Sequence, residues 1–200
     1  MRIAVLLSGN GRSLQNLIDR SRAGRLAAQI VLVISNKADA FGLRRARTAG
    51  ISTHVVTKKE NPGERFSQRI FGLCRDAEVK LVCLAGFLQL LTIPDDFAGR
   101  VLNIHPALLP KFGGHGMFGH HVHEAVLAAG ETVSGCTVHI ANNEYDRGPI
   151  ILQKQVLVLL DDTAETLAAR VFEAECEAYP EAITKWRDLQ YPSDTSSRQT

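Results

Sequence analysis

Short apolar runs alternate with amphipathic stretches along the chain. The apolar runs predict β-strands at residues 3–7, 30–34, 81–85, 101–104, 137–140 and 150–160. The early runs are continuous rather than alternating, which is typical of strands buried on both faces of a parallel sheet. Between these runs, apolar residues recur with the spacing of an amphipathic helix, which predicts helices over residues 13–23, 42–49, 63–77 and 121–129. This alternation of strand and helix predicts a doubly wound α/β fold with a mostly parallel sheet.

The pattern changes in the last third of the chain. Residues 135–159 contain two apolar runs joined by a polar loop, which predicts an antiparallel pair at one edge of the sheet. A long C-terminal helix is predicted over about residues 163–188, with Asp162 or Thr163 as its N-cap. Residues 189–200 are polar and predict a frayed tail. We therefore expect a single domain over residues 1–188.

Composition and charge narrow the classes of protein further. The chain is 45% hydrophobic and 22% charged, as is usual for a globular protein, and its net charge is only +2. Its Lys and Arg residues are scattered, so we expect no nucleic-acid partner. The first apolar run is too short for a signal peptide, and no run approaches the roughly 20 residues that span a bilayer. We therefore expect no membrane partner.

The cysteines point to a reducing compartment. None of Cys74, Cys83, Cys136 and Cys176 forms a C-x-x-C pair, so we expect buried, reduced thiols. Such thiols are typical of cytoplasmic proteins. The sequence therefore predicts a cytoplasmic protein without disulfide bonds.

A glycine loop, "SGNGRSLQ" at residues 8–15, follows the first apolar run. It lacks the lysine of a P-loop, and Leu14 stands where a dinucleotide fingerprint needs its third glycine. Glycines let a backbone approach a ligand closely, and a helix N-terminus offers free N–H groups to an anion. Ser13 can cap the helix, and Arg12 adds a full charge. The stretch favours a small anion such as a monophosphate, with a tight turn that binds nothing as the alternative.

The stretch "VLNIHPALLP" at residues 101–110 carries candidate chemistry. Asn103 and His105 are two residues apart on a predicted strand, so they share one face. Pro106 ends the strand, which places both side chains at its carboxyl end, where open α/β sheets bind ligands. An amide can donate to a developing oxyanion, and an imidazole can move protons at neutral pH. A buried, hydrogen-bonded pair is the alternative.

Further polar residues lie on the later strands and loops. Thr137 and His139 share a strand face, and Asp146 follows in a loop. An aspartate beside His105 would favour the imidazolium, although from sequence alone Asp146 is more simply a turn residue.

A cluster of histidines occupies the stretch "GGHGMFGHHVHEAV". No cysteine or carboxylate joins these histidines at a familiar ligand spacing, so they predict a structural or substrate-contacting loop rather than a metal site. On a helix that begins near residue 120, His120 and Glu124 would form a solvated pair. The histidines in question are His115, His120, His121 and His123.

Taken together, these motifs resemble the folate-dependent phosphoribosylglycinamide formyltransferases over about residues 1–188. The motifs are "LLSGNGRSLQNLID", "SNKADAFGLRRARTAGI", "LAGFLQLL", "LNIHPALLPKF", "GCTVHI", "DRGPIILQ" and "EAECEAYP". "NIHPALLP" is shared by several formyltransferases, whereas the glycine loop and "SNKADAFGLRRA" are more specific. The resemblance implies a Rossmann-like formyltransferase fold. It also implies transfer of a formyl group from 10-formyltetrahydrofolate to the amine of glycinamide ribonucleotide in purine biosynthesis, without a metal.

The resemblance also implies catalytic roles. Asn103 would hold the formyl oxygen as it becomes an oxyanion. His105, protonated, would stabilise that charge and act as general acid. Asp146 would keep His105 charged and help to remove a proton from the amine, with Thr137 and His139 in support.

Binding roles follow from the same resemblance. The backbone of Gly11, Arg12 and Ser13 would hold the substrate phosphate, and Glu175 would contact the substrate. Residues 1–100 would form the ribonucleotide side, and residues 101–188 the folate and catalytic side. The folate would contact Asn103 and Asp146, and it would lie along Leu88, Gln89, Leu90, Leu91, Asn142, Asn143, Glu144 and Tyr145.

Several positions depart from the family's usual pattern. Arg12 replaces a serine, Gln89 an arginine, and Arg147 a glycine. If that last position needs a positive φ, an arginine costs about 1–2 kcal/mol there. Arg147 could also lower the pKa of Asp146 or reach the folate tail. The Gly- and His-rich stretch at 113–121 is longer than in many relatives.

The same residues are also compatible with other functions. The acceptor could be another amine, such as an amino sugar nucleotide, or the methionyl group of initiator tRNA, or water in a deformylase. The tRNA enzyme would need an added domain and a basic surface, and the deformylase an N-terminal regulatory domain. A non-catalytic folate-binding protein is the alternative outside enzymes. The sequence leaves monomer and homodimer equally open.

Overall fold

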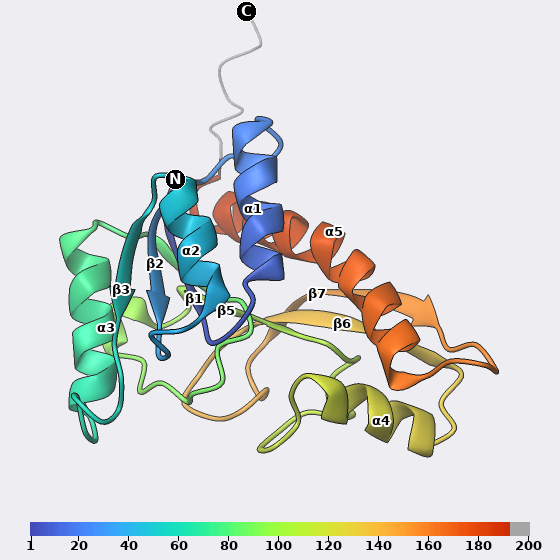
Figure 1. Ribbon diagram of the computed structural model, residues 1–200. Helices are drawn as coiled ribbons and strands as arrows, with labels where there is room; N and C mark the ends of the chain where they lie inside the picture. Colours follow the sequence, from blue (N-terminus) through green and yellow to red (C-terminus); the bar gives the residue numbers. More distant parts are fainter. Residues whose placement is uncertain (193–200) are drawn as a thin grey trace, which may run out of the picture.

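The computed structural model describes residues 1–192 and is built around a seven-stranded sheet (Figure 1). The strand order is β3-β2-β1-β4-β5-β6-β7. Strands β1 to β5 are parallel, whereas β6 runs antiparallel to both β5 and β7. The predicted fold class is therefore confirmed. The strands are β1 (Arg2–Leu7), β2 (Gln29–Ser35), β3 (Ser52–Val55), β4 (Leu81–Leu84), β5 (Val101–His105), β6 (Val133–Ile140) and β7 (Ile150–Leu157).

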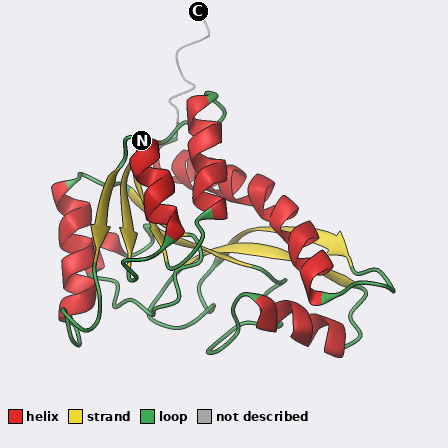
Figure 2. Ribbon diagram, in the orientation of Figure 1, coloured by secondary structure: helices red, strands yellow, loops and turns green. Residues whose placement is uncertain are grey.

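Helices cover both faces of the sheet (Figure 2). Helices α1, α2 and α5 contribute Leu14, Leu43 and Trp186 to one apolar core. Helix α3 and the short 3₁₀ helix η1 contribute Phe71 and Phe97 to a second core on the opposite face. The helices are α1 (Arg12–Arg22), α2 (Phe41–Thr48), α3 (Arg65–Asp76), η1 (Asp95–Phe97), α4 (His120–Ala128) and α5 (Ala164–Gln190).

The apolar runs become strands because both faces of the sheet are covered. Every residue from Ile3 to Leu7 is fully buried, which is why the central strand shows no alternation. Strand β3 was not predicted, because "STHV" at the sheet edge is only half-buried and has no apolar run. Strand β6 begins at Val133, four residues before the predicted start.

Helix α5 is longer than predicted. It continues to Gln190, so the predicted tail from residue 189 begins too early, and residues 193–200 lie outside the described part of the chain. Of the two predicted caps, Thr163 is the N-cap, in a capping box with Thr166. The helix is tied to the sheet by Tyr179, whose hydroxyl lies 2.9 Å from the carbonyl oxygen of Leu84. This anchoring fixes the part of α5 that faces the candidate site.

The cysteines follow the prediction with one exception. Cys74, Cys83 and Cys136 are buried free thiols, whereas Cys176 is only half-buried. Burial raises the pKa of Cys74, Cys83 and Cys136 to about 12, so these three thiols stay protonated. Within residues 1–192, no helix is both long enough and apolar enough to cross a membrane.

Candidate functional site

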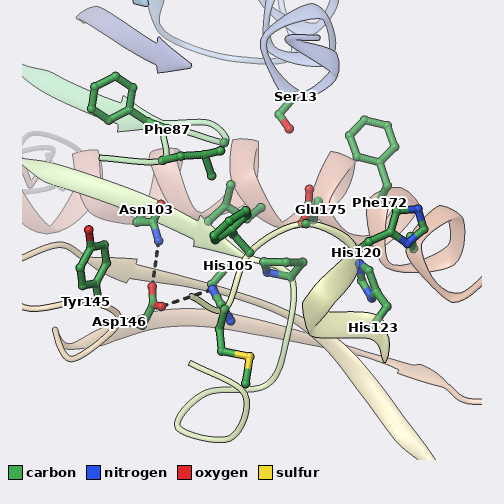
Figure 3. Close-up of a pocket in the computed structure, with 18 of the residues that line it drawn as sticks. Ser13, Phe87, Asn103, His105, His120, His123, Tyr145, Asp146, Phe172 and Glu175 are labelled. Atoms are coloured by element: carbon green, nitrogen blue, oxygen red, sulfur yellow. Dashed lines mark hydrogen bonds and ion pairs between the residues drawn. The ribbon is translucent and has the colours of Figure 1, made fainter. Parts of the chain in front are cut away.

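A cavity of about 680 Å³ opens at the carboxyl ends of β1, β4 and β5. The strand order reverses between β1 and β4, and such a switch point is where open α/β sheets bind ligands. The walls come from the loops after β1 and β4, the end of β5, the glycine-rich loop before α4, and helices α4 and α5. Figure 3 shows Ser13, Phe172 and Glu175 along the same cavity as Asn103 and His105.

The glycine loop after β1 lies tightly against the start of α2. Gly11 has φ +68°, and a Cβ added there would lie 2.6 Å from the Cα of Gly42. The Gly42 amide also donates to the carbonyl oxygen of Gly9 at 3.0 Å. Gly11 is the N-cap of α1, and no side chain caps the helix, so the prediction that Ser13 caps it is wrong. The glycines therefore allow the backbone of this loop to pack closely against the backbone of α2. The N-terminus of α1 has no side-chain cap.

Arg12 of α1 and Glu175 of α5 line the same end of the cavity, beside this loop. The Arg12 guanidinium lies over the ring of Phe172, 3.7 Å from its centroid. Burial raises the pKa of Glu175, one helical turn further along α5, to about 7, although the Arg12 charge opposes the shift. Arg12, Ser13, Phe172 and Glu175 all line the cavity. This end of the cavity combines an exposed cation with a carboxyl group that titrates near neutral pH.

Asn103, His105 and Asp146 form the polar centre of the cavity. The pairing of β5 with β6 sets Asn103 opposite His139 and His105 opposite Thr137. Asp146, from the loop after β6, has φ +54° and reaches back over β5. Its Oδ1 lies 3.2 Å from Asn103 Nδ2, and its Oδ2 lies 3.5 Å from His105 Nδ1. The structure thus brings together the three residues predicted to be catalytic (Figure 3).

His139 completes a triangle with two of these residues. Its Nε2 lies 3.1 Å from Asn103 Nδ2 and 3.4 Å from Asp146 Oδ1. Burial raises the pKa of Asp146, but hydrogen bonding to His139 and to the Gly114 N–H, together with the electrostatic interaction with His105, holds it below its usual value. Asp146 is therefore a carboxylate at neutral pH.

His105 is held on both sides of its ring. Its Nε2 lies 2.8 Å from the Phe112 carbonyl oxygen, opposite the Asp146 contact at Nδ1. Burial lowers the pKa of His105 below its ordinary value, although the Asp146 charge and the Phe112 carbonyl oppose this. The neutral ring is therefore favoured at neutral pH. The prediction of a protonated His105 differs from this result, because loss of solvation outweighs the single carboxylate.

Thr137 contributes through the loop that follows β5. Its hydroxyl donates to the Ala107 carbonyl oxygen at 2.6 Å and accepts from the Leu109 N–H at 3.0 Å. Thr137 is fully buried and touches the loop rather than the cavity. It therefore holds the backbone that follows His105.

Comparison with known proteins agrees with this geometry. The formyl transferase family matches residues 1–183. The Escherichia coli (strain K12) phosphoribosylglycinamide formyltransferase is 39% identical over 191 residues, which cover 94% of this chain and 88% of that protein. The crystal structure of glycinamide ribonucleotide transformylase 1 from Symbiobacterium toebii has a TM-score of 0.86 at 42% identity, covering 92% of this chain and 85% of that one.

The chain belongs to the formyl transferase family. This confirms the resemblance inferred from the sequence motifs. A trifunctional purine biosynthetic protein adenosine-3 from Drosophila pseudoobscura pseudoobscura is 46% identical over 187 residues, or 91% of this chain. The chain spans only 13–18% of the length of such trifunctional relatives.

Only some of the residues expected to contact folate line the cavity of this formyl transferase. Leu88 and Tyr145 line the cavity and are partly exposed at its rim. Leu91 is 3% exposed and belongs to the core, so it cannot offer its side chain to a ligand. Gln89, Leu90, Asn142, Asn143 and Glu144 lie outside the cavity lining. Asn143 instead accepts a hydrogen bond from the Ile93 N–H at 2.8 Å and so ties two loops together.

Three histidines of the Gly-rich stretch, His115, His120 and His123, line the cavity. Within residues 1–192, no three His, Cys, Asp or Glu side chains are grouped as a metal site would require. The expected pairing of His120 with Glu124 is wrong. His120 lies 3.7 Å from Glu165 of α5, and His121 lies 3.4 Å from Glu124 instead.

Arg147 behaves differently from the expectation. The positive φ falls on Asp146, whereas Arg147 is not among the positive-φ residues, so the arginine carries no such backbone strain. Nor is Arg147 among the charges that lower the pKa of Asp146. The next residue, Gly148, is the constrained one, because a Cβ there would lie 1.7 Å from the Ile140 carbonyl oxygen.

Sequence reasoning missed several residues that line the cavity. Phe87 and Phe172 were not singled out from the sequence, yet both line the cavity. His123 was grouped with the loop histidines, yet its side chain is 96% buried in α4 and lines the cavity. Burial lowers the pKa of His123 to about 4, so the ring is neutral. An apolar stripe gives no signal that one of its members faces a cavity.

Proposed function

We propose that this chain transfers a formyl group from 10-formyltetrahydrofolate to the amine of glycinamide ribonucleotide. The observation that carries the proposal is the cluster of Asn103, His105 and Asp146 at the carboxyl end of β5, inside the cavity. The names of the Escherichia coli and Symbiobacterium toebii relatives support the same reaction. Both substrates are small molecules, and the cavity is of a size typical for such ligands.

The ribonucleotide binds at the end of the cavity formed by α1 and α5. Its phosphate accepts hydrogen bonds from the backbone N–H groups at Gly11, Arg12 and Ser13, where the uncapped helix N-terminus favours an anion. The Arg12 guanidinium, which lines the same cavity, adds a full positive charge. Glu175 lines the same end and binds a polar group of the sugar or amine.

The folate binds at the opposite end of the cavity. Phe87 and Leu88 offer apolar surface after β4, and Tyr145 offers an aromatic face from the loop before Asp146. This arrangement directs the formyl group of the folate toward Asn103. The remaining residues of the predicted folate stretch act through the backbone or outside the cavity.

The first chemical step forms a tetrahedral adduct. The amine nitrogen of the ribonucleotide attacks the formyl carbon, and the π-electron pair moves onto the formyl oxygen. Asn103 turns one amide N–H from its protein partners to this oxyanion. Loss of a single oxyanion donor typically costs about 2.7–4 kcal/mol of transition-state stabilisation.

The second step moves one proton and breaks one bond. Neutral His105 accepts the proton of the attacking nitrogen, and the Asp146 carboxylate stabilises the imidazolium that forms. The bond from the formyl carbon to N10 of the folate then breaks, and its electron pair goes to N10. His105 returns the proton to N10, while an oxygen electron pair restores the carbonyl. The products are the formylated ribonucleotide and tetrahydrofolate.

Substitution of His105 tests this function. We expect His105→Ala to lower kcat by at least about 10², the usual contribution of acid–base catalysis, with folate affinity nearly unchanged. His121→Ala is the matched control, because His121 is an exposed histidine on α4, and its turnover should stay at the wild-type level. Full turnover in His105→Ala would contradict the assigned role.

A further inference from the structure

The segment Phe112–Gly114 contacts both members of the proton-transfer pair. The Phe112 carbonyl oxygen lies 2.8 Å from His105 Nε2, and the Gly114 N–H donates to Asp146 Oδ2 at 3.0 Å. Two adjacent peptide groups of one loop therefore hold an imidazole and a carboxylate that come from different strands and loops. Phe112 was not singled out from the sequence, and Gly113 was noted only as part of the Gly- and His-rich stretch.

Gly113 leaves no room for a side chain between these contacts. A Cβ added there would lie 2.5 Å from Leu109 Cδ2 and 3.2 Å from Asp146 Cβ. Phe112 adopts φ +55°, a left-handed conformation that favours glycine over a bulky residue. The surrounding contacts must therefore impose this backbone path on the segment.

The start of the same loop is anchored to β6 and β7. The Thr137 hydroxyl accepts from the Leu109 N–H at 3.0 Å, and the Gln153 side-chain amide donates to the Leu109 carbonyl oxygen at 2.9 Å. Gln153 also donates to the Thr137 hydroxyl at 3.0 Å. Because Leu109 is fixed in this way, the carbonyl of Phe112 three residues later is presented to His105 in a defined position.

We propose that the 112–114 segment is a positioning element that confines the proton exchanged by His105 to its Nδ1 atom. The inference rests on the proposed function and names the atom through which it works. A carbonyl oxygen can only accept, so the Phe112 contact requires Nε2 to carry a hydrogen. Nδ1 is then the one ring nitrogen free to gain or lose a proton, and it lies 3.5 Å from Asp146 Oδ2.

The segment also sets where the new charge appears. A proton accepted at Nδ1 makes an imidazolium whose N–H faces the carboxylate that Gly114 holds in place. Two further histidines lie near this pair: His139, beside Asp146 Oδ1, and His123, which lines the cavity together with Tyr145 and Glu175. Neither offers His105 a second acceptor at Nε2, because the Phe112 carbonyl occupies that atom.

The tautomer can be measured directly in the wild-type protein. In ¹⁵N spectra of histidine side chains, with the His105 signals assigned by their loss in His105→Ala, we expect neutral His105 to carry its proton on Nε2. A neutral ring with its proton on Nδ1 would overturn the proposal. The measurement needs no substrate, so it stands or fails separately from the proposed formyl transfer.

Gly113→Ala tests the positioning role, with Gly72→Ala as its control. Gly72 lies in α3, and a Cβ there meets nothing within 4 Å. We expect Gly113→Ala to lower kcat at least about tenfold with little change in either KM, since a misplacement of about 1 Å can cost 10²-fold. The His105 ring should also become a mixture of tautomers, whereas Gly72→Ala should keep the wild-type kcat and tautomer.

Two further results would overturn the positioning role. One is wild-type kcat in Gly113→Ala. The other is a loss of kcat while His105 keeps the single tautomer of the wild-type protein. If Gly113→Ala fails to fold, the wild-type tautomer still decides whether the Phe112 carbonyl fixes the proton on Nε2.

Discussion

Glu175 is a carboxyl group whose surroundings disfavour its charge. Burial raises its pKa from 4.5 to about 7, against the opposing charge of Arg12. Between these two values, the folded protein keeps a proton that the unfolded chain has lost. The contribution of Glu175 to stability is therefore greatest below the unfolded value and falls as the pH rises toward 7.

Replacement by a neutral isostere should remove this pH dependence. As the pH rises from about 5 to about 8, we expect the free energy of unfolding of Glu175→Gln to increase relative to that of wild type by up to about 3 kcal/mol. The measurement is the free energy of unfolding by denaturant at both pH values. Glu173→Gln changes an exposed carboxyl group on the same helix and should show no such trend. A constant difference between wild type and Glu175→Gln would contradict the assignment.

At the scale of single residues, local spacing predicted some contacts but not others. Asn103 and His105 share a face because side chains alternate along a strand, a rule that needs no knowledge of the fold. Asp146 reaches them only because β5 pairs antiparallel with β6, which sequence spacing does not define. The lowered pKa of His105 could not be read from spacing either, because it depends on how deeply the ring is buried.

The glycine loop and helix α2 pack as one unit at the scale of elements. An added Cβ at Gly42 would lie 2.5 Å and 2.7 Å from the two methyl groups of Leu7, and the Gly42 Cα is itself 2.6 Å from a Cβ placed on Gly11. Arg45 of the same helix donates to the Asn10 carbonyl oxygen at 2.9 Å. Helix α2 therefore holds the loop at the start of α1.

Gly42→Ala should disturb this packing. We expect the free energy of unfolding to fall by about 1–3 kcal/mol, the usual cost of overpacking a core. Gly72→Ala, in open space on α3, should leave stability unchanged or raise it by about 0.5–1 kcal/mol. Denaturant titrations of the two variants and wild type provide the comparison. Equal stability of Gly42→Ala and wild type would show that the contact relaxes without cost.

Elements with strong apolar patterns were predictable, and weakly patterned ones were not. Strands β1, β2, β4 and β5 are buried on both faces and read as continuous apolar runs. Strand β3 is a short edge strand whose pairing with β2 depends on tertiary context, so its sequence gives no signal. The end of α5 was misplaced because its last residues, Leu189 and Gln190, are exposed and so extend no buried apolar face.

The whole molecule brings residues from opposite ends of the chain into one cavity. Ser13 lies in α1 and Glu175 in α5, yet both line it. The Asn16 side chain donates to the Cys176 carbonyl oxygen at 2.8 Å and so joins α1 to α5 beside the cavity. The alternating pattern predicted the sheet, but the return of α5 to the first helix could be inferred only from the family resemblance.

The central claim is that this cavity binds a folate formyl donor beside a phosphorylated amine and transfers the formyl group between them. The most direct test is a spectroscopic assay of tetrahydrofolate formation from 10-formyltetrahydrofolate, with and without glycinamide ribonucleotide. We predict product only when the ribonucleotide is present, in a one-to-one ratio with formylated ribonucleotide. Product formed equally without the ribonucleotide would make water the acceptor, and no product with either mixture would contradict the proposed acceptor.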